Sequence, residues 1–345
     1  MMRVLQFSRN IEVNFLIIVA SDGTGDFRSL QDAIDAIPFG NIEEMIIYIK
    51  SGVYKQKVKI AKPMVHIIGE DPTKTILTFD DYAKKLLANG EPMNTFNSYS
   101  VYIGGRDFTA ENVTFENSAG DGEIVGQAVA VYVDADRAFF KNCRFLGCQD
   151  TLFTGPLPKN PTPLGLNVQH PTLGSGPAEY MGIIRQYYQD CFIQGDIDFI
   201  FGSATAVFNR CEISSNDRRQ LVNGYITAGS TSSHIPFGYV FMDCRLTSKA
   251  APQTVYLGRP WRDFAKVAFL NCWMGPHIIP AGWHNWDKPE REKTVTYVEY
   301  GSTGPGAASS QRAPWAKTLT PEQLKLYTLT NILSGPDHWE PYNIN

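Results

Sequence analysis

The sequence predicts an all-β protein built as a parallel β-helix, a solenoid in which short strands stack rung upon rung. The first observation is a recurring phrase: a polar residue, a cysteine, any residue, and then a large apolar residue. The five copies are Asn142-Cys143-Arg144-Phe145, Asp190-Cys191-Phe192-Ile193, Arg210-Cys211-Glu212-Ile213, Asp243-Cys244-Arg245-Leu246 and Asn271-Cys272-Trp273-Met274. The second observation is that short runs of Val, Ile, Phe and Tyr alternate with Gly and Asn/Asp turns, without a helical period. Because the phrase returns at spacings of 20 to 48 residues, we expect stacked repeats in one domain over residues 1–345, with a core at about 15–340.

The two ends of the chain carry elements suited to closing such a stack. Residues 15–21 (FLIIVAS) form an apolar run that leads into a turn, which predicts a buried first strand. The same run could belong to a signal peptide, but no small-residue cleavage site precedes the turn. Residues 29–38 begin with a capping-box pattern and end at a proline, and Thr320-Pro321 opens a second helix. We therefore expect short capping helices at the ends.

Two segments have neither a strand nor a helix period. Residues 154–181 are rich in proline and glycine and predict a loop insertion. Residues 81–98 predict another loop. Long loops on a rigid stack often form the walls of a binding groove, so we expect a groove between them.

The composition excludes several kinds of partner. The formal charge of −4 provides no basic stripe for nucleic acid or an anionic membrane, and no apolar run reaches the length of a membrane span. None of the six cysteines forms a CxxC pair, so we expect no zinc and interpret the repeated cysteines as small buried residues that stack on one another. We expect no metal, no nucleic acid and no membrane partner.

Four motifs carry residues that could perform chemistry. Residues 195–202 (GDIDFIFG) place a carboxylate within a large apolar run, where an unpaired charge is costly. The others are residues 126–130 (GQAVA), 149–153 (QDTLF) and 257–261 (LGRPW). If adjacent rungs bring them together, one carboxylate can attack an ester, a second carboxyl can protonate the leaving alkoxide, and two amides can hold the oxyanion. Each residue alone also has a structural interpretation: carboxylates cap turns, glutamines form ladders and arginines pin loops.

These motifs resemble those of the pectin methylesterase (pectinesterase) family. QDTL, DFIFG and LGRPW occur in the family's order, with GVY at residues 52–54, and the similarity extends from about residue 17 through Trp283 to the C-terminal helix. The resemblance implies a right-handed parallel β-helix that removes methyl groups from methyl-esterified polygalacturonate, releases methanol and uses no cofactor. Residues 225–231 (YITAGST) resemble bacterial members more than plant members.

The resemblance also implies a role for each site residue. Asp198 would be the nucleophile, and Asp150 the general acid and then the general base. The remaining assignments are Gln127 and Gln149 for the oxyanion site, Arg259 for pairing with Asp198, and Trp261, Phe201, Phe153 and Tyr132 for the sugar-binding groove. We expect Asp196, which has no counterpart in the family, to be a turn or rim residue.

The chain departs from the family pattern at three points. Gln56 stands where the family usually has glutamate, at a position that we expect to be structural. Phe153 replaces the commoner tyrosine, and 48 residues separate Asp150 from Asp198, more than is usual.

Three other functions stay open. They are a polyuronate lyase, which would need an acidic calcium cluster and a basic proton acceptor, an esterase or thioesterase with another acyl substrate, and a non-catalytic carbohydrate-binding β-helix. We expect a monomer that acts on pectin or methylated oligogalacturonides. The resemblance implies export, whereas the lack of a visible cleavable signal and the unpaired cysteines suit the cytoplasm, so both locations stay open.

Overall fold

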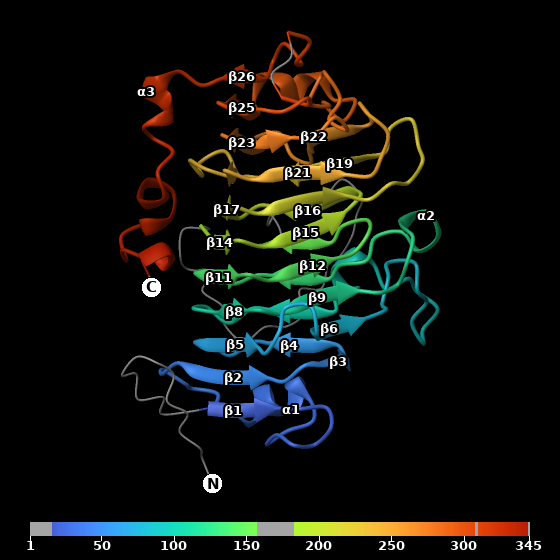
Figure 1. The fold of residues 1–345 in the computed structure, drawn as a ribbon, viewed down its shortest axis with the longest axis vertical. Helices are drawn as coiled ribbons and strands as arrows, with labels where there is room; N and C mark the ends of the chain where they lie inside the picture. The colour runs from blue at the N-terminus through green and yellow to red at the C-terminus, as the bar shows by residue number, and fades with distance from the viewer. Residues whose placement is uncertain (1–15, 157–182, 308–309, 344–345) are drawn as a thin grey trace.

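The computed structural model describes residues 16–156, 183–307 and 310–343, and it is a parallel β-helix (Figure 1). Within these residues the strands form three parallel sheets, and each strand pairs with its counterpart on the next rung. The first, sheet A, contains β1 (Leu16–Val19), β2 (Met45–Ile49), β5 (Val65–Gly69), β8 (Thr109–Glu111), β11 (Ala138–Lys141), β14 (Arg185–Gln189), β17 (Thr205–Asn209), β20 (Tyr239–Met242), β23 (Lys266–Leu270), β25 (Thr296–Tyr300) and β26 (Lys317–Thr318). Sheet B contains β3 (Gly52–Lys55), β6 (Thr75–Phe79), β9 (Thr114–Asn117), β12 (Arg144–Leu146), β15 (Phe192–Gly195), β18 (Glu212–Ser215), β21 (Arg245–Ser248) and β24 (Trp273–Met274). Sheet C contains β4 (Val58–Ile60), β7 (Val101–Ile103), β10 (Val131–Val133), β13 (Leu152–Thr154), β16 (Ile197–Gly202), β19 (Gly224–Gly229) and β22 (Val255–Pro260). The predicted fold class is confirmed.

The repeated phrase marks the corner between sheets A and B. In each copy the polar residue lies between two strands and has a positive φ, for example 50° at Asn142 and 54° at Asp190. Asn and Asp tolerate this left-handed conformation better than most residues, which explains their frequency at the corner. The cysteine that follows is buried, and all six cysteines are free thiols. Cys143 lies with its Sγ 3.4 Å from the Ala110 carbonyl oxygen of the preceding rung, so the structural interpretation of the repeated cysteines is confirmed.

Aromatic side chains stack along the inside of sheet A. Because the strands are parallel and in register, one position of each strand falls directly above the same position of the next. The rings at this position have centroids 4.4 to 4.8 Å apart, and they are Phe140, Tyr188, Phe208, Phe241 and Phe269. This column forms part of a continuous apolar core.

Helix α1 (Leu30–Ala36) covers the N-terminal end of the stack, as predicted. Its cap differs from a capping box, because the second partner comes from another part of the chain. The Ser29 side chain accepts from the Asp32 N–H, while the Gln56 side-chain oxygen accepts from the Ser29 hydroxyl and from the Gln31 N–H. Gln56 therefore has the structural role that we expected. The predicted first strand is β1, which begins at Leu16.

The second predicted helix is α3 (Pro321–Leu324), which begins with a capping box between Thr320 and Gln323 beside the last strands of sheet A (Figure 1). From there the chain runs back along the outside of sheet A, through η3 (Thr330–Ser334) and η4 (Pro341–Asn343). Apolar residues of this segment pack against the outer face of the sheet. The C-terminal segment thus covers a side of the solenoid as well as reaching its end.

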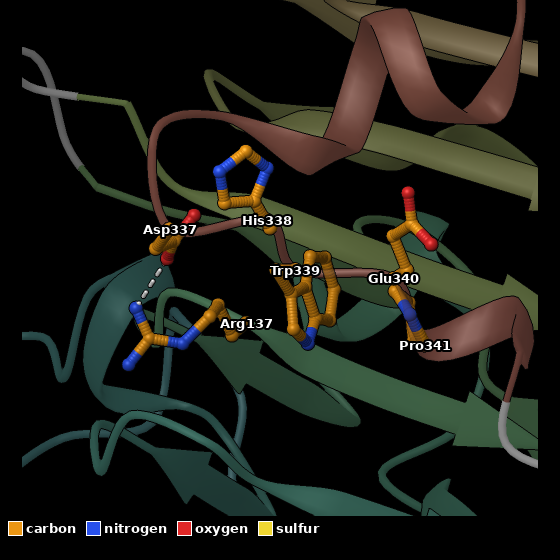
Figure 2. Close-up of a pocket in the computed structure, with 6 residues that line it drawn as sticks. All are labelled: Arg137, Asp337, His338, Trp339, Glu340 and Pro341. Atoms are coloured by element: carbon orange, nitrogen blue, oxygen red, sulfur yellow. Dashed lines mark hydrogen bonds and ion pairs between the residues drawn. The ribbon is translucent and has the colours of Figure 1, made fainter.

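An ion-pair network fastens this segment to sheet A. Arg137 is paired with Asp337 beside Trp339 (Figure 2). These residues line a hollow of about 470 Å³. Arg185, almost fully buried, donates to the Leu333 and Ser334 carbonyl oxygens and also pairs with Asp337. Asp337 pairs with both arginines, and Asp136 also pairs with Arg185, so the positive charges in this hollow are balanced. We therefore interpret the hollow as structural.

The predicted loop at 81–98 is confirmed, and it contains the short turn η1 (Thr95–Asn97). Of the predicted insertion at 154–181, residues 157–181 lie outside the described part of the chain. Two further short helices are α2 (Gly122–Val125) and η2 (Pro289–Lys293). No helix among the described residues has the length and apolarity to span a bilayer.

We expect the two ion pairs of His66 to make a pH-dependent contribution to the stability of the fold. It lies on the outer face of sheet A between Glu44 and Glu111, with ring nitrogens 3.3 and 3.2 Å from their carboxylates. Burial by itself lowers the pKa of His66, but the two carboxylates outweigh it and raise the pKa to about 9. The pKa of His66 in the unfolded chain is about 6.5. The two ion pairs of His66 therefore stabilise the fold fully below that pH, and this stabilisation is lost as the pH rises through about 9.

We therefore expect His66→Gln to lower the free energy of unfolding by on the order of 2 kcal/mol near pH 6 and by much less near pH 9.5. Thermal melts of the protein and the variant across this range check the prediction. A difference in Tm that does not change with pH would contradict it.

Candidate active site

A cleft of about 510 Å³ lies on the outer face of sheet C and contains most of the predicted site residues. The residues that line it are Thr95, Phe96, Gln127, Gln149, Asp150, Asp198, Phe201, Ala228, Arg259, Trp261, Arg262, Trp286, Lys288 and Arg291. They come from β16, β19 and β22, from the residues that precede β10 and β13, and from the loops beside these strands. Residues distant in sequence meet here because the rungs stack.

The register of sheet C aligns the two aspartates. Leu152 of β13 pairs with Ile200 of β16, so Asp150 and Asp198, each two residues earlier, occupy equivalent places on adjacent rungs. The Asp150 N–H donates to the Ile197 carbonyl oxygen at 3.0 Å, which holds the rungs together at this point. Stacking therefore brings both carboxyls to one cleft, as the sequence predicts.

The backbone at both aspartates is unusual. Asp150 has φ of 65° and Asp198 has φ of 49°. The pairing of β16 with β19 also shifts in register between Ile197 and Ile200, which is a β-bulge at Asp198. Bulges and left-handed residues often direct a side chain out of the regular alternation, and they concentrate at functional sites. Here they accompany two carboxyls that line the cleft.

Arg259 holds Asp198 through two parallel hydrogen bonds. Its Nε donates to Oδ1 at 2.9 Å and its Nη2 donates to Oδ2 at 2.7 Å. Tyr225 and Trp286 lie on either side of the guanidinium, with both ring centroids 3.8 Å from its central carbon. Bidentate pairing and cation–π contact both favour a fixed, charged guanidinium. Arg259 is therefore locked in position against the carboxylate.

The two carboxyls differ in acidity. Burial raises the pKa of Asp198, but the hydrogen bonds and charge of Arg259 oppose this rise. Burial also raises the pKa of Asp150, the negative charge of Asp198 raises it further, and Arg259 only partly offsets these effects. The Asp150 side chain has no hydrogen-bond partner among the described residues. The pKa of Asp150 thus lies well above its usual value, and Asp198 is the carboxyl that ionises first.

Gln127 and Gln149 line the cleft beside the aspartates. In the described part of the chain neither side-chain amide makes a hydrogen bond, so they do not form the amide ladder of the structural interpretation. Their N–H groups are available to an oxygen atom in the cleft.

The four predicted groove aromatics lie in two layers. Trp261 and Phe201 line the cleft, with ring centroids 6.0 Å apart. Tyr132 and Phe153 have no exposed surface, because Phe96 from the loop at 81–98 packs edge-on against both. The prediction that Tyr132 and Phe153 line the groove is therefore wrong, since these rings form the layer beneath it.

Asp196 does not line the cleft. It is buried at the corner between β15 and β16, where its carboxylate accepts from the Ile197 N–H at 2.7 Å. This agrees with a turn residue, although the side chain is buried and not at a rim.

Several lining residues were not identified from the sequence. Phe96 lies in the predicted loop and Trp286 lies beyond the last recognised motif, so no local signal marked them. No sequence motif identified the other cationic residues that line the cleft, which are Arg262, Lys288 and Arg291. Among the described residues no cluster of three or more His, Cys, Asp or Glu side chains has the arrangement of a metal site.

Comparison with known proteins agrees with this geometry. The pectinesterase family model matches residues 16–157 and 174–336. Pectinesterase 31 of Arabidopsis thaliana is 38% identical over 315 residues, which cover 89% of each chain. The solved pectin methylesterase from carrot is 30% identical with a TM-score of 0.77, covering 95% of this chain and 96% of that one. The pectin methylesterase from Erwinia chrysanthemi is 29% identical with a TM-score of 0.74, covering 95% and 98%. A pectin methylesterase in complex with a hexasaccharide also matches. The chain whose cleft joins Asp150, Asp198 and Arg259 belongs to the pectinesterase family.

Proposed function

We propose that this protein removes methyl groups from the methyl-esterified polygalacturonate of pectin and releases methanol. The observation that carries the proposal is the pair of in-register aspartates in one cleft, of which one is bound by an arginine and the other has no partner among the described residues. Two-carboxyl ester hydrolysis requires neighbouring carboxyls of different acidity, and Arg259 opposes the rise in pKa at Asp198, while the charge of Asp198 adds to the rise at Asp150.

In the first half of the reaction, an Asp198 oxygen attacks the C6 carbonyl carbon of a methylated galacturonate unit. The amide groups of Gln127 and Gln149 donate to the oxygen that becomes negative, a type of contact worth about 3 kcal/mol per donor in other enzymes. Asp150 gives its proton to the departing methoxide, so methanol leaves and an acyl–enzyme anhydride remains.

In the second half, Asp150 is a carboxylate and accepts a proton from water. The hydroxide attacks the acyl carbon and the bond to Asp198 breaks. The galacturonic acid unit that forms loses its proton to solvent and is released as a carboxylate. Arg259 stabilises the carboxylate of Asp198 before the attack and after its release. Trp261 and Phe201 offer apolar faces on which sugar rings can stack, and Tyr132 and Phe153 support them from below.

The partner that we propose is pectin or a methylated oligogalacturonide, bound by a single β-helix domain that acts as a monomer. The name of one matching structure records a bound hexasaccharide, which supports an oligomeric substrate. The particular resemblance of residues 225–231 to bacterial members stays a prediction, since the proteins compared above come from plants as well as a bacterium.

We expect the protein to release methanol from pectin in the presence of a chelator, without a product that absorbs in the ultraviolet. A lyase would form an unsaturated uronate, which absorbs there, and a calcium-dependent lyase would stop when the chelator is added. A carbohydrate-binding protein without activity would release no methanol. An esterase for another acyl substrate would hydrolyse that ester faster than pectin.

A further inference from the structure

Helix α2 packs on the chain segment that carries Gln149. The helix lies between β9 and β10 and stands out from the stack (Figure 1). A Cβ atom added at Gly122, the first residue of α2, would lie 2.9 Å from the Cβ of Gln149 and 3.4 Å from its Oε1. Carbon atoms in favourable contact are about 3.5–4.0 Å apart, so no room is left for a methyl group. The backbone of α2 therefore rests directly on the Gln149 side chain.

This packing can orient the two glutamine amides of the cleft. Neither amide makes a side-chain hydrogen bond within the described residues, whereas the backbone around both is fixed. The Ala128 N–H donates to the Gln149 carbonyl oxygen at 3.1 Å, and the Ala83 N–H donates to the Gln127 carbonyl oxygen at 2.8 Å. Gln127 directly follows Gly126, which ends α2 with φ of 78°. A movement of α2 would thus reach Gln149 by contact and Gln127 through the chain.

The helix is anchored to a distant rung through Glu123. Its Oε1 accepts hydrogen bonds from the Arg218 Nη2 and from the Gln220 side-chain amide, both at 3.0 Å. These two partners lie in the connection between β18 and β19, and β19 pairs with β16, the strand that contains Asp198. Arg218 is itself held, because its Nη1 donates to the Asn223 carbonyl oxygen at 3.1 Å. The contacts of Glu123 therefore tie α2 to the part of the stack that carries the proposed nucleophile.

The exposure of this anchor argues against a role mainly in stability. The side chain of Glu123 is 46% exposed, and exposed ion pairs contribute little to the stability of a fold. Oxyanion stabilisation, by contrast, requires donors at about 3 Å, and a small displacement of a catalytic group lowers the rate strongly. A weak anchor can therefore have a large effect on the reaction.

We propose that α2 is a positioning element, which the contacts of Glu123 hold in place so that the amides of Gln127 and Gln149 point at the oxyanion. This inference rests on the proposed function. Gly122 and Glu123 do not line the cleft, so they act through the two glutamines and without contact with the substrate.

The main test is Gly122→Ala, which adds a methyl group where Gln149 leaves no room. Either α2 or the Gln149 side chain must move, so we expect kcat for methanol release from pectin to fall by about 10- to 100-fold. KM should change by less than about twofold, and the pH profile should keep both limbs, because amides do not titrate. Gly40→Ala is the matched control and should leave kcat unchanged, since a Cβ atom there meets nothing within 4 Å.

A double-mutant cycle distinguishes positioning from general damage to the fold. Gln149→Ala removes the amide that α2 orients, so Gly122→Ala should lower kcat by only about threefold or less in that background, through Gln127. Full losses that multiply in the double variant would overturn the proposal, and so would an unchanged kcat in Gly122→Ala.

The anchor is tested separately at Glu123, whose replacement leaves the core intact. Glu123→Ala removes the acceptor of both hydrogen bonds and should lower kcat by about three- to tenfold, whereas Glu123→Gln keeps an oxygen in the same place and should retain most of the activity. Glu212→Ala is the control and should leave kcat unchanged, because this exposed glutamate accepts from the Thr247 hydroxyl and does not line the cleft. Full activity in Glu123→Ala would contradict the role of the anchor. If the proposed function itself were wrong, the unaltered protein would release no methanol from pectin.

Discussion

Replacing Asp198 with asparagine is expected to lower kcat for methanol release from pectin by at least about 10⁴-fold, because an amide cannot form the acyl–enzyme bond. KM should change little, since the surfaces that bind the sugar, Trp261 and Phe201, stay in place. The measurement is methanol release under saturating substrate, combined with a thermal melt to show that the variant is folded. The melt matters because Arg259 loses its charged partner, and a broken buried pair can cost about 3–5 kcal/mol.

The chain offers a matched control for this variant. Asp190 pairs with Arg210 through two hydrogen bonds of 2.9 Å and has a similar backbone, with φ of 54°, but it lies at an exposed corner away from the cleft. Asp190→Asn removes the same charge from the same kind of pair and should leave turnover unchanged. Substantial turnover by a folded Asp198→Asn variant would show that another group attacks the ester.

Replacing Asp150 with asparagine is expected to lower kcat by about 10²–10⁴-fold and to remove the alkaline limb of the pH profile. In the unaltered protein Asp198 must be ionised, so activity rises as the pH passes its pKa. Asp150 must be protonated, so activity falls as the pH passes its higher pKa. The activity should therefore follow a bell-shaped pH profile. Its two apparent pKa values belong to the pair of aspartates and not to either one alone, since the two carboxyls interact.

The pH profile of kcat/KM measures this directly. Asp196→Asn is the control, because the negative charge of Asp196 raises the pKa of Asp150. This variant should keep its activity and move the alkaline limb to lower pH, and the asparagine oxygen can still accept from the Ile197 N–H. An alkaline limb that persists in Asp150→Asn would assign that limb to a group other than Asp150.

The local sequence determined the rungs and the corners of this protein. The phrase around Asn142-Cys143 predicts a stack because it repeats one requirement, a polar residue that tolerates a left-handed turn before a small buried one. Helix starts at Ser29 and Thr320 are similarly local, since a cap is satisfied largely by neighbouring N–H groups. The motifs that carry Asp150, Asp198 and Arg259 could be recognised for the same reason, because each is a short continuous run.

Tertiary structure alone decided which side chains face the substrate. Phe96 reaches over Phe153 and Tyr132 from a loop with no motif, so two aromatics expected in the groove lie beneath it. Tyr225 and Trp286 enclose Arg259 from two separate segments. The alternation of apolar and polar residues in a strand and the conformation of a turn depend on adjacent residues. The exposure of a side chain and its polar partners depend on the distant loops that lie over it. No short stretch of sequence contains that information.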